Sequence, residues 1–482
     1  MRKDLKGTSH RVVWQLALGL GCLLVAAVVV VACNSGSSSN SASGMGTVNT
    51  MLSDPATCQA PNGPYSHVYV TITDVQASTS ATASATGSGW VDLTPNLSQA
   101  PVQVDLLGQA NNQCFLATLG DNLQLQAGTY QQIRLILASN TAAGVSGNAC
   151  GSANNCVVLA ADNSVHTLQL SSEAQTGIKI PAGQIASGGF TVTAGKTVDL
   201  DIDFNTCQSL VVEGNGQYRL KPVLHAGEVS TTSTSINGTV MDASTGNPVD
   251  GTVVVAVEQK DSTGVDRIQM STLAGANGTF VFCPLPAGTY DVVIVGTRHD
   301  GVLYQPDIIT GVSVGDTVGT VKLSLPTVTA TSSVSLSGQV TAQNSSMAGT
   351  VMDAQLSALE TMNSNTYTIP LAPTSTQSAS TLSVETAAST STVICPSGTY
   401  CANYSMMEPS GGASVGAWAS SGVTFTVNAN LASYIVDGLA IVPGSGGTPD
   451  CSPSEVKTST TALTGAGPYN VTGLNLAFVG CQ

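Results

Sequence analysis

The chain has 482 residues, enough for about three or four domains. Only 9% of the residues are charged and 42% are hydrophobic, which is typical of folded domains and not of a charged disordered chain. The net charge of −15 argues against nucleic acid or anionic lipid surfaces as partners, because both require clustered Lys and Arg. Abundant Gly, Ser, Thr and Val indicate β-structure with many turns.

Residues 1–32 have the pattern of an export signal, with a basic start followed by an apolar run over 12–32. The run could also span a bilayer as an uncleaved anchor, since about 20 apolar residues suffice. Its end, Val30-Val31-Ala32-Cys33, resembles the lipobox of bacterial lipoproteins. That resemblance implies cleavage before Cys33 and attachment of diacylglycerol to the Cys33 thiol.

Residues 33–62 are expected to tether the chain to a membrane. Their first part, NSGSSSNSASG (34–44), has the composition of a flexible Gly/Ser linker. Two or three acyl chains would hold the protein firmly on the membrane, because each buried methylene contributes about 0.8 kcal/mol to membrane binding. The lipobox resemblance, with Asn34 after the Cys, favours the outer membrane. We therefore expect a cell-envelope protein that faces the periplasm or the exterior.

The chain contains 12 cysteines. Cys22 leaves with the signal and Cys33 is the lipidation site, so ten remain, and an even number in an exported protein predicts disulfides. Zinc is disfavoured, because the nearest cysteines are spaced C-x5-C with no nearby His. Short separations favour three pairs: Cys150–Cys156, Cys395–Cys401 and Cys451–Cys481. The pairing of four others stays open: Cys58, Cys114, Cys207 and Cys283.

The first block after the tether is expected over 63–228. Its opening stretch, SHVYVTITDVQAS (66–78), alternates as a half-buried strand does. Further strand candidates are 90–95, 102–107, 130–138, 166–171, 190–195, 197–204 and 218–226.

Several motifs of this block occur in a recognisable order: VYVTITDVQAS, WVDLTP, VDLLG, LQAGTYQQIRLIL, IKIPAG, FTVTAGKTVDLDIDF and SLVVEGNGQYRLKPVL. Together they resemble the family called domain of unknown function 4382, which is found on bacterial lipoproteins. The resemblance implies a β-rich fold and an envelope location, but no activity.

One strand candidate of this block carries alternating polar side chains, which fall on one sheet face: Asp199, Asp201, Asp203 and Asn205. A calcium face is one interpretation. An EF-hand loop is not, because Phe204 and Leu210 stand where that loop needs Gly and Glu. We favour a solvated face opposite the apolar residues of the same strand.

The second block is expected over 233–326, with turns at Gly246-Asn247-Pro248 and Asn277-Gly278 between alternating strands. Its segments SINGTVMDASTGNPVDGTVVVAVEQ (235–259) and GTFVFCPLPAGTYDVVIVG (278–296) resemble the carboxypeptidase regulatory-like domain. The resemblance implies a small transthyretin-like β-sandwich that is an accessory module and not the peptidase. Sandwiches of this type resemble carbohydrate-binding folds. Tyr290 is expected to pack over a corner.

The third block is expected over 331–482. VSLSGQV (334–340) is similar to TSINGTV (234–240), so a related sandwich is predicted to begin there. The segment 351–362, VMDAQLSALETM, is the best helix candidate. A short segment that ends in Tyr recurs at 128–130, 288–290, 398–400 and 467–469. We interpret each as a turn that leads into a strand of a sandwich, and not as a binding motif. The fold class is therefore all-β, with tandem β-sandwich-type domains after a cleaved lipoprotein signal and a flexible tether.

No catalytic or metal-binding set emerges from the sequence. Ser313 and Ser414 lie in G-x-S-x-G strings, but neither has the strand–turn–helix context that a nucleophile elbow requires. Four histidines share no metal-ligand spacing: His67, His166, His225 and His299. With only 4% aromatic residues, three loop candidates are interpreted as core or corner residues and not as a sugar platform: Trp90, Trp418 and Tyr304.

The sequence thus predicts no catalytic residue, no metal and no cofactor. The favoured function is a non-enzymatic, membrane-anchored envelope lipoprotein whose sandwich modules bind or scaffold, with a glycan or an envelope protein as partner. One alternative is a surface glycan-binding protein of a carbohydrate-uptake system. Another is a hydrolase with its site in 63–228, since paired carboxylates can be distant in sequence.

Overall fold

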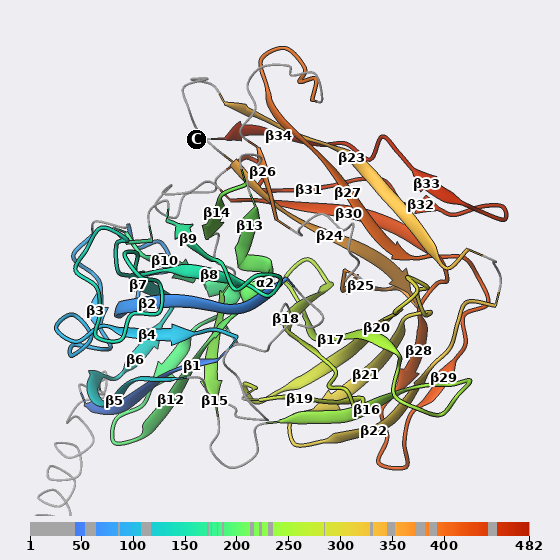
Figure 1. Cartoon of the computed structure of the whole chain (residues 1–482). Coiled ribbons are helices and arrows are strands. Elements are labelled where there is room, and N and C mark those ends of the chain that lie inside the picture. Colours follow the sequence, from blue (N-terminus) through green and yellow to red (C-terminus); the bar gives the residue numbers. More distant parts are fainter. Residues whose placement is uncertain are drawn as a thin grey trace, which may run out of the picture.

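The structure is a computed structural model that describes residues 44–481, with gaps at 54–63, 85–86, 108–116, 171–172, 175, 181, 186–187, 213–215, 221–223, 230–234, 284, 328–330, 345–351, 372–380, 385–392 and 442–450. The described chain is nearly all β-structure (Figure 1). Its helices are the short η1 (Ala182–Gln184) and α2 (Thr206–Ser209). No described helix is long and apolar enough to span a bilayer. The predicted signal, Cys33 and residues 34–43 of the predicted tether lie outside the described residues.

The first block packs two main sheets face to face. One has the order β15-β12-β1-β5, from Leu224–Val229, Thr197–Phe204, Met45–Ser53 and Ala117–Gln126. The prediction of a flexible tether over 33–62 is therefore wrong for Met45–Ser53, which form a strand. Here β1 runs parallel to β12 and antiparallel to β5, and its alternate side chains, such as Val48 and Leu52, enter the core.

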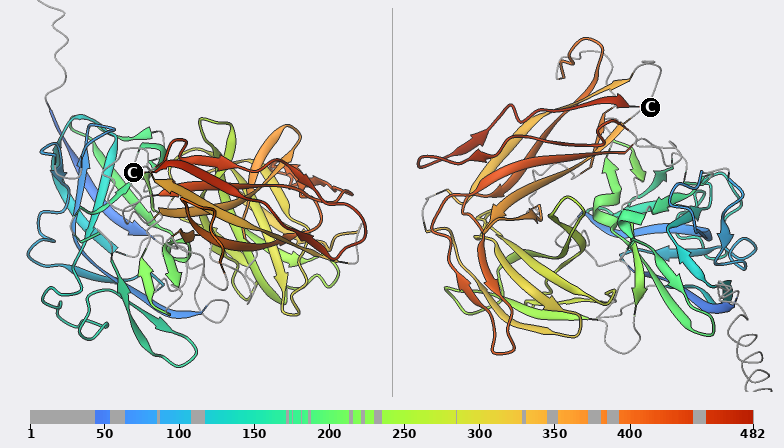
Figure 2. Two further views of the ribbon diagram at one scale, coloured as in Figure 1. Left: turned by 90° about the horizontal axis from the view of Figure 1, so that it is seen from above. Right: turned by 180° about the vertical axis from the view of Figure 1, so that it is seen from behind.

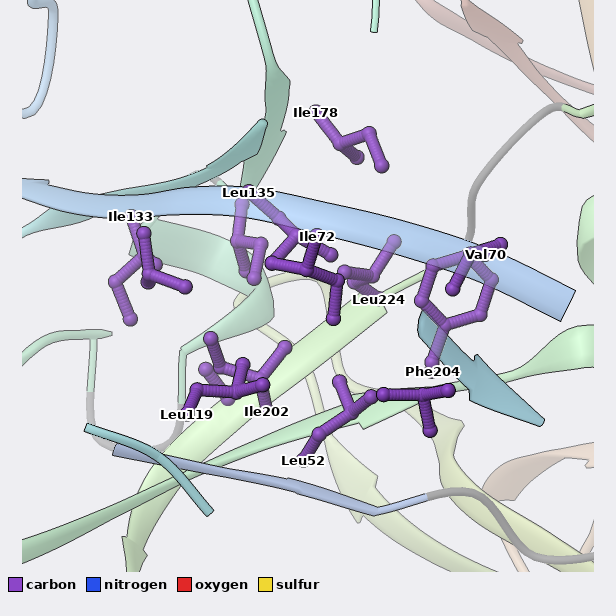
Figure 3. Packing of buried hydrophobic residues seen from close by; sticks show 14 of the residues in the cluster. Leu52, Val70, Ile72, Leu119, Ile133, Leu135, Ile178, Ile202, Phe204 and Leu224 are labelled. Carbon is purple, nitrogen blue, oxygen red and sulfur yellow. The ribbon is translucent and has the colours of Figure 1, made fainter. Parts of the chain in front are cut away.

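The second sheet of this block has the order β10-β7-β2-β8-β9-β14-β13, and β3 and β4 also pair with β2. Its strands are β2 (Tyr65–Ser78), β3 (Val91–Asp92), β4 (Val102–Asp105), β7 (Gln132–Leu137), β8 (Cys156–Leu159), β9 (Val165–Gln169), β10 (Ile178–Ile180), β13 (Leu210–Val212) and β14 (Tyr218–Leu220). A small extra sheet joins β6 (Gly128–Tyr130) to β11 (Phe190–Val192). Figure 3 shows Val70 and Ile72 of β2 packed above Ile202 and Phe204 of β12.

The second block is a sandwich of a small sheet and part of a large one. The small sheet has the order β19-β16-β22, from Thr279–Phe282, Ile236–Asp242 and Thr317–Leu323. The facing strands have the order β18-β17-β20-β21, from Val265–Leu273, Gly251–Lys260, Thr289–Arg298 and Asp307–Ser313. Phe280, Phe282 and Ile294 belong to the core between them.

The third block repeats this topology, as the similarity between 234–240 and 334–340 predicts. In the second block, β16 is antiparallel to β19 and parallel to β22. In the third, β23 (Ser333–Asn344) is antiparallel to β27 (Tyr400–Pro409) and parallel to β33 (Tyr469–Val471) and β34 (Leu476–Cys481). Its other strands are β24 (Met352–Met362), β25 (Asn365–Ile369), β26 (Thr381–Val384), β30 (Ser433–Ile441), β31 (Glu455–Lys457) and β32 (Thr461–Ala462).

The large sheets of the second and third blocks are continuous. β18 pairs in parallel with β25, and β21 pairs in parallel with β28 (Ser414–Ala417), which is followed by β29 (Thr424–Thr426). The result is one 12-stranded sheet, and Figures 1 and 2 show β28 and β29 at its far end from the first block. Val293 and Ile308 pack into the third block's core while Val292 and Ile309 pack into the second's. Burial on both faces explains the uninterrupted apolar run of β20.

The predicted helix at 351–362 is wrong, because residues Met352–Met362 form strand β24. Met352, Ala354, Leu356 and Ala358 alternate into the third block's core. β24 pairs with β25, β26 and β30, so tertiary pairing overrides the helix propensity of the Leu, Glu, Ala and Met residues.

Three of the four recurring Gly-x-Tyr segments place the tyrosine at a corner of the fold. The Tyr290 hydroxyl donates a hydrogen bond to the Pro286 carbonyl at 2.9 Å, four residues earlier. Equivalent bonds with the same offset join Tyr130 to Gln126 (3.0 Å) and Tyr469 to Gly465 (2.8 Å). A tyrosine that ties its hydroxyl to the backbone just upstream is a known corner device of β-sandwiches.

Three disulfides at the short-range spacings are present, with S–S distances of 2.02 Å for Cys150–Cys156, 2.12 Å for Cys395–Cys401 and 2.05 Å for Cys451–Cys481. Cys283 is also disulfide-bonded. The first two bridges close tight loops, and the third holds the last strand, β34, to the chain 30 residues earlier.

Candidate binding site

Two distant parts of the 12-stranded sheet meet at a short seam. The residues before β28 meet the residues before β30, where Gly411 forms a β-bridge with Leu431. The Gly412 amide donates to the Asn430 carbonyl at 3.0 Å, and the Ala432 amide donates to the Ser410 carbonyl at 2.9 Å. These bonds bring the second-block edge, extended by β28, against the third-block strands.

Glu360 lies at this seam. It occupies β24 opposite Tyr434 of β30 and Tyr367 of β25, and its side chain is 2% exposed. Its carboxyl group accepts a hydrogen bond from the Ala413 amide at 3.1 Å and another from the Ser433 amide. Burial outweighs these two bonds and raises the pKa of Glu360 to about 7. A large fraction of the carboxyl groups is therefore uncharged at neutral pH.

A cavity of about 580 Å³ opens beside Glu360. Its walls come from the β24–β25 turn, the start of β28 and the β29–β30 loop. The polar lining side chains are Glu360, Thr361, Asn363, Thr426, Asn428, Asn430 and Ser433, and the larger apolar ones are Met362, Val415, Val427 and Leu431. The lining contains no Lys, Arg or His.

Asn428 is held in place by its backbone. Its amide donates to Ser414 Oγ at 3.3 Å, and its carbonyl accepts from Gln305 Nε2 at 2.6 Å. The Asn428 side-chain oxygen accepts two bonds of 3.1 Å from Asn430. Its Nδ2 contacts only the Met362 sulfur, at 3.8 Å, and a thioether is a weak acceptor. The Asn428 amide group thus keeps donor capacity at the cavity.

Gly412 is the close-approach residue of the site. A Cβ at this position would lie 2.5 Å from Asn428 Nδ2 and 3.0 Å from Glu360 Oε1. Both polar groups therefore pack directly over the Gly412 backbone, and any larger side chain would displace them.

A second acid lies behind Glu360. Glu408 of β27 is fully buried, and neither of its carboxylate oxygens has a hydrogen-bond partner. Burial, and then the nearby Glu360 charge, raise the pKa of Glu408 well above its usual value. The charge of Glu360 therefore favours the protonated form of Glu408.

The interpretation of Asp199–Asn205 as a solvated face is wrong. Asp201 and Asp203 are buried, because β12 lies inside its sheet between β1 and β15 and is covered on both faces. Ser53 Oγ donates to Asp201 Oδ2 at 2.7 Å. Burial raises the pKa of Asp201 to about 8 and that of Asp203 well above its usual value. Within the described part of the chain, no group of three or more His, Cys, Asp or Glu could share a metal ion.

The G-x-S-x-G serines lie in strands. Ser313 ends β21 and Ser414 begins β28, and the next element in each case is another strand. Ser414 serves the seam by accepting the Asn428 amide bond.

The aromatic and histidine candidates are scattered. Trp90 lies under Arg134, whose guanidinium carbon is 4.4 Å from the ring centre. Tyr304 is buried and donates to Asp242 at 2.5 Å, while Trp418 packs against the second block's core. The four histidines are distributed over the first and second blocks: His67 in β2, His166 in β9, His225 in β15 and His299 after β20.

The cavity residues Glu360, Gly412 and Asn428 were not found from the sequence. The available signal was the phase of Glu360, which continues the alternation of the buried positions 352, 354, 356 and 358. An acid in phase with buried apolar residues indicates a polar site inside a core. The helix interpretation of this segment concealed that phase.

Comparison with known families identifies the first two blocks. Residues 45–222 match the family described as Domain of unknown function (DUF4382), and residues 235–326 match the Carboxypeptidase regulatory-like domain. Both resemblances and their order are thereby confirmed. The cavity residues lie outside the two matched ranges. No curated protein matches this chain.

Solved structures give weak overall likenesses. The Bacillus anthracis TIE protein is 11% identical, over 90% of this chain and 51% of its own, with a TM-score of 0.15. A DUF3823 family protein from Bacteroides uniformis is 13% identical over 48% and 98%, with a TM-score of 0.14. BcpA, the major pilin subunit of Bacillus cereus, is 10% identical over 58% and 99%, with a TM-score of 0.15. The chain spans about half of the TIE protein, and at these scores the likenesses carry no argument.

Proposed function

We propose that this chain, in which a domain of unknown function 4382 precedes a carboxypeptidase regulatory-like domain, is a non-enzymatic binding or scaffolding lipoprotein of the bacterial cell envelope. The observation that carries the proposal is the continuous 12-stranded sheet, which unites an accessory module with a second sandwich of like topology. Such a body offers a rigid surface and a preformed cavity. Rigid support of this kind is what a binding module requires.

The membrane attachment rests on Val30-Val31-Ala32-Cys33 and the polar segment 34–44. Strand β1 begins at Met45. Eleven residues at most about 3.5 Å each would let the folded body lie within about 40 Å of the lipid-bearing Cys33. The proposed protein is therefore displayed close to its membrane and faces the periplasm or the exterior.

Cys33→Ala tests the anchor. The expected result is loss of radiolabelled palmitate incorporation and accumulation of an uncleaved precursor that retains residues 1–32. Cys22→Ala is the matched control, since it removes a thiol from the same apolar segment and should leave both readouts unchanged. Normal lipid labelling and cleavage of Cys33→Ala would refute the proposed attachment.

A further inference from the structure

We infer that the cavity beside Glu360 binds a short neutral saccharide of one or two rings. The inference deepens the proposed binding function by assigning it a site and a ligand class. It rests on the charge of the lining, its hydrogen-bonding capacity, its size and its rigid support.

The charge of the lining selects against ionic ligands. Glu360 is the only ionisable residue in it, and no Lys, Arg or His is present to pair with an anion. A cation would have to compete with the Ala413 and Ser433 amides that already donate to Glu360. A neutral ligand avoids each of these costs.

The hydrogen-bonding groups of the lining suit hydroxyls. Three asparagine side chains line the cavity, and the Asn428 oxygen and one N–H of the Asn430 amide are already bonded to each other. The remaining amide groups join three hydroxyls that both donate and accept: Thr361, Thr426 and Ser433. Sugar hydroxyls have the same dual character, so neighbouring hydroxyls on a ring can pair with an amide and a hydroxyl at once. The donor capacity of Asn428 Nδ2 provides one such contact.

The size and the walls of the cavity fit a small ring. A volume of about 580 Å³ lies within the range of roughly 300 to 1,000 Å³ that small-ligand sites occupy. Met362, Val415 and Leu431 supply apolar surface for the C–H faces of a ring. Val427, at 65% exposure, is an exposed apolar side chain next to this polar cavity.

Asn363 is placed in the cavity by a rigid turn. Asn363 and Ser364 connect β24 to β25 with φ of 49° and 67°, so both residues of the two-residue turn are left-handed. Such turns fix the register of a hairpin. The side chain of Asn363 is therefore presented without a large loss of freedom on binding.

The experiment uses the chain without residues 1–33 on an array of neutral, acidic and amino saccharides, followed by titration calorimetry with the strongest mono- or disaccharide. Binding to neutral saccharides is expected. Binding restricted to acidic or amino saccharides, or no binding, overturns the inference. A protein that is lipidated at Cys33 yet binds no neutral saccharide refutes this site while leaving the proposed attachment intact.

Asn363→Gly locates the binding to this cavity. Glycine keeps the left-handed turn and removes the amide, so the fold should persist while the dissociation constant rises about three- to tenfold. Asn163→Gly is the matched control, because Asn163 also has a positive φ, of 57°, in an exposed turn of the first block. Asn430→Ala is the second variant and should weaken binding similarly. Equal affinity in wild type, Asn363→Gly and Asn430→Ala would refute the assignment of this cavity.

Discussion

Glu360→Gln tests the electrostatic description of the seam. Burial raises the pKa of Glu360 from 4.5 to about 7. Below about pH 4.5 the carboxyl is protonated in both the folded and the unfolded chain. As the pH rises from 4.5 to 7 the unfolded chain releases this proton first, so folding loses stability. Above pH 7 both states are ionised and this contribution stops changing.

The magnitude follows from the size of the shift. About 2.5 pKa units at 1.36 kcal/mol each amount to about 3 kcal/mol of stability lost between pH 4 and pH 8. Glutamine keeps the shape and can accept the Ala413 amide bond, but it does not ionise. The variant should therefore lose about 3 kcal/mol less than wild type over this pH range.

Urea unfolding followed by tryptophan fluorescence measures this difference. In a Trp90→Phe background without residues 1–33, Trp418 is the only tryptophan, and it packs against the core next to the seam. Unfolding free energies of wild type and Glu360→Gln are compared at pH 4, 6 and 8. The exposed Asp300→Asn controls for the loss of one negative charge. Parallel pH profiles for wild type and Glu360→Gln would refute the reasoning.

Two further predictions concern stability. Tyr290→Phe removes the hydroxyl bond to Pro286 at a sandwich corner and should cost about 1 kcal/mol, measured by urea unfolding; an unchanged midpoint would contradict the corner role. Cys451→Ser/Cys481→Ser opens a link between residues 30 apart and should lower stability by about 3 to 4 kcal/mol on loop-entropy grounds, measured by thermal melting. A melting point unaffected by this double substitution would exclude a stabilising role for the Cys451–Cys481 bridge.

Local patterns were sufficient for much of the fold. Alternation identified the strands over 66–78 and 197–204, and the similarity of 334–340 to 234–240 identified a second sandwich of like topology. Short spacing indicated the three disulfides. Each of these features depends on residues that are close in the chain or on a motif that is repeated within it.

The burial of acidic side chains in β12 could not be derived from local sequence patterns. The alternation of Asp199, Asp201 and Asp203 places them on one sheet face, but only the position of β12 inside its sheet makes that face buried towards its end. The composition of 351–362 likewise favours a helix, but pairing with β25, β26 and β30 makes residues 352–362 a strand. Local propensity is worth only a fraction of a kcal/mol per residue, so tertiary pairing outweighs it.

The sequence by itself determined an all-β chain with two sandwiches of similar pattern, while the export signal and the lipobox at Cys33 stay predictions. The tertiary structure alone decided that these sandwiches share one sheet and enclose a cavity at Glu360. The pairings that create it, Val265 with Thr366 and Asp307 with Ser414, join residues about a hundred positions apart. Register between such distant strands is set by the faces that must be buried together, which no local pattern contains.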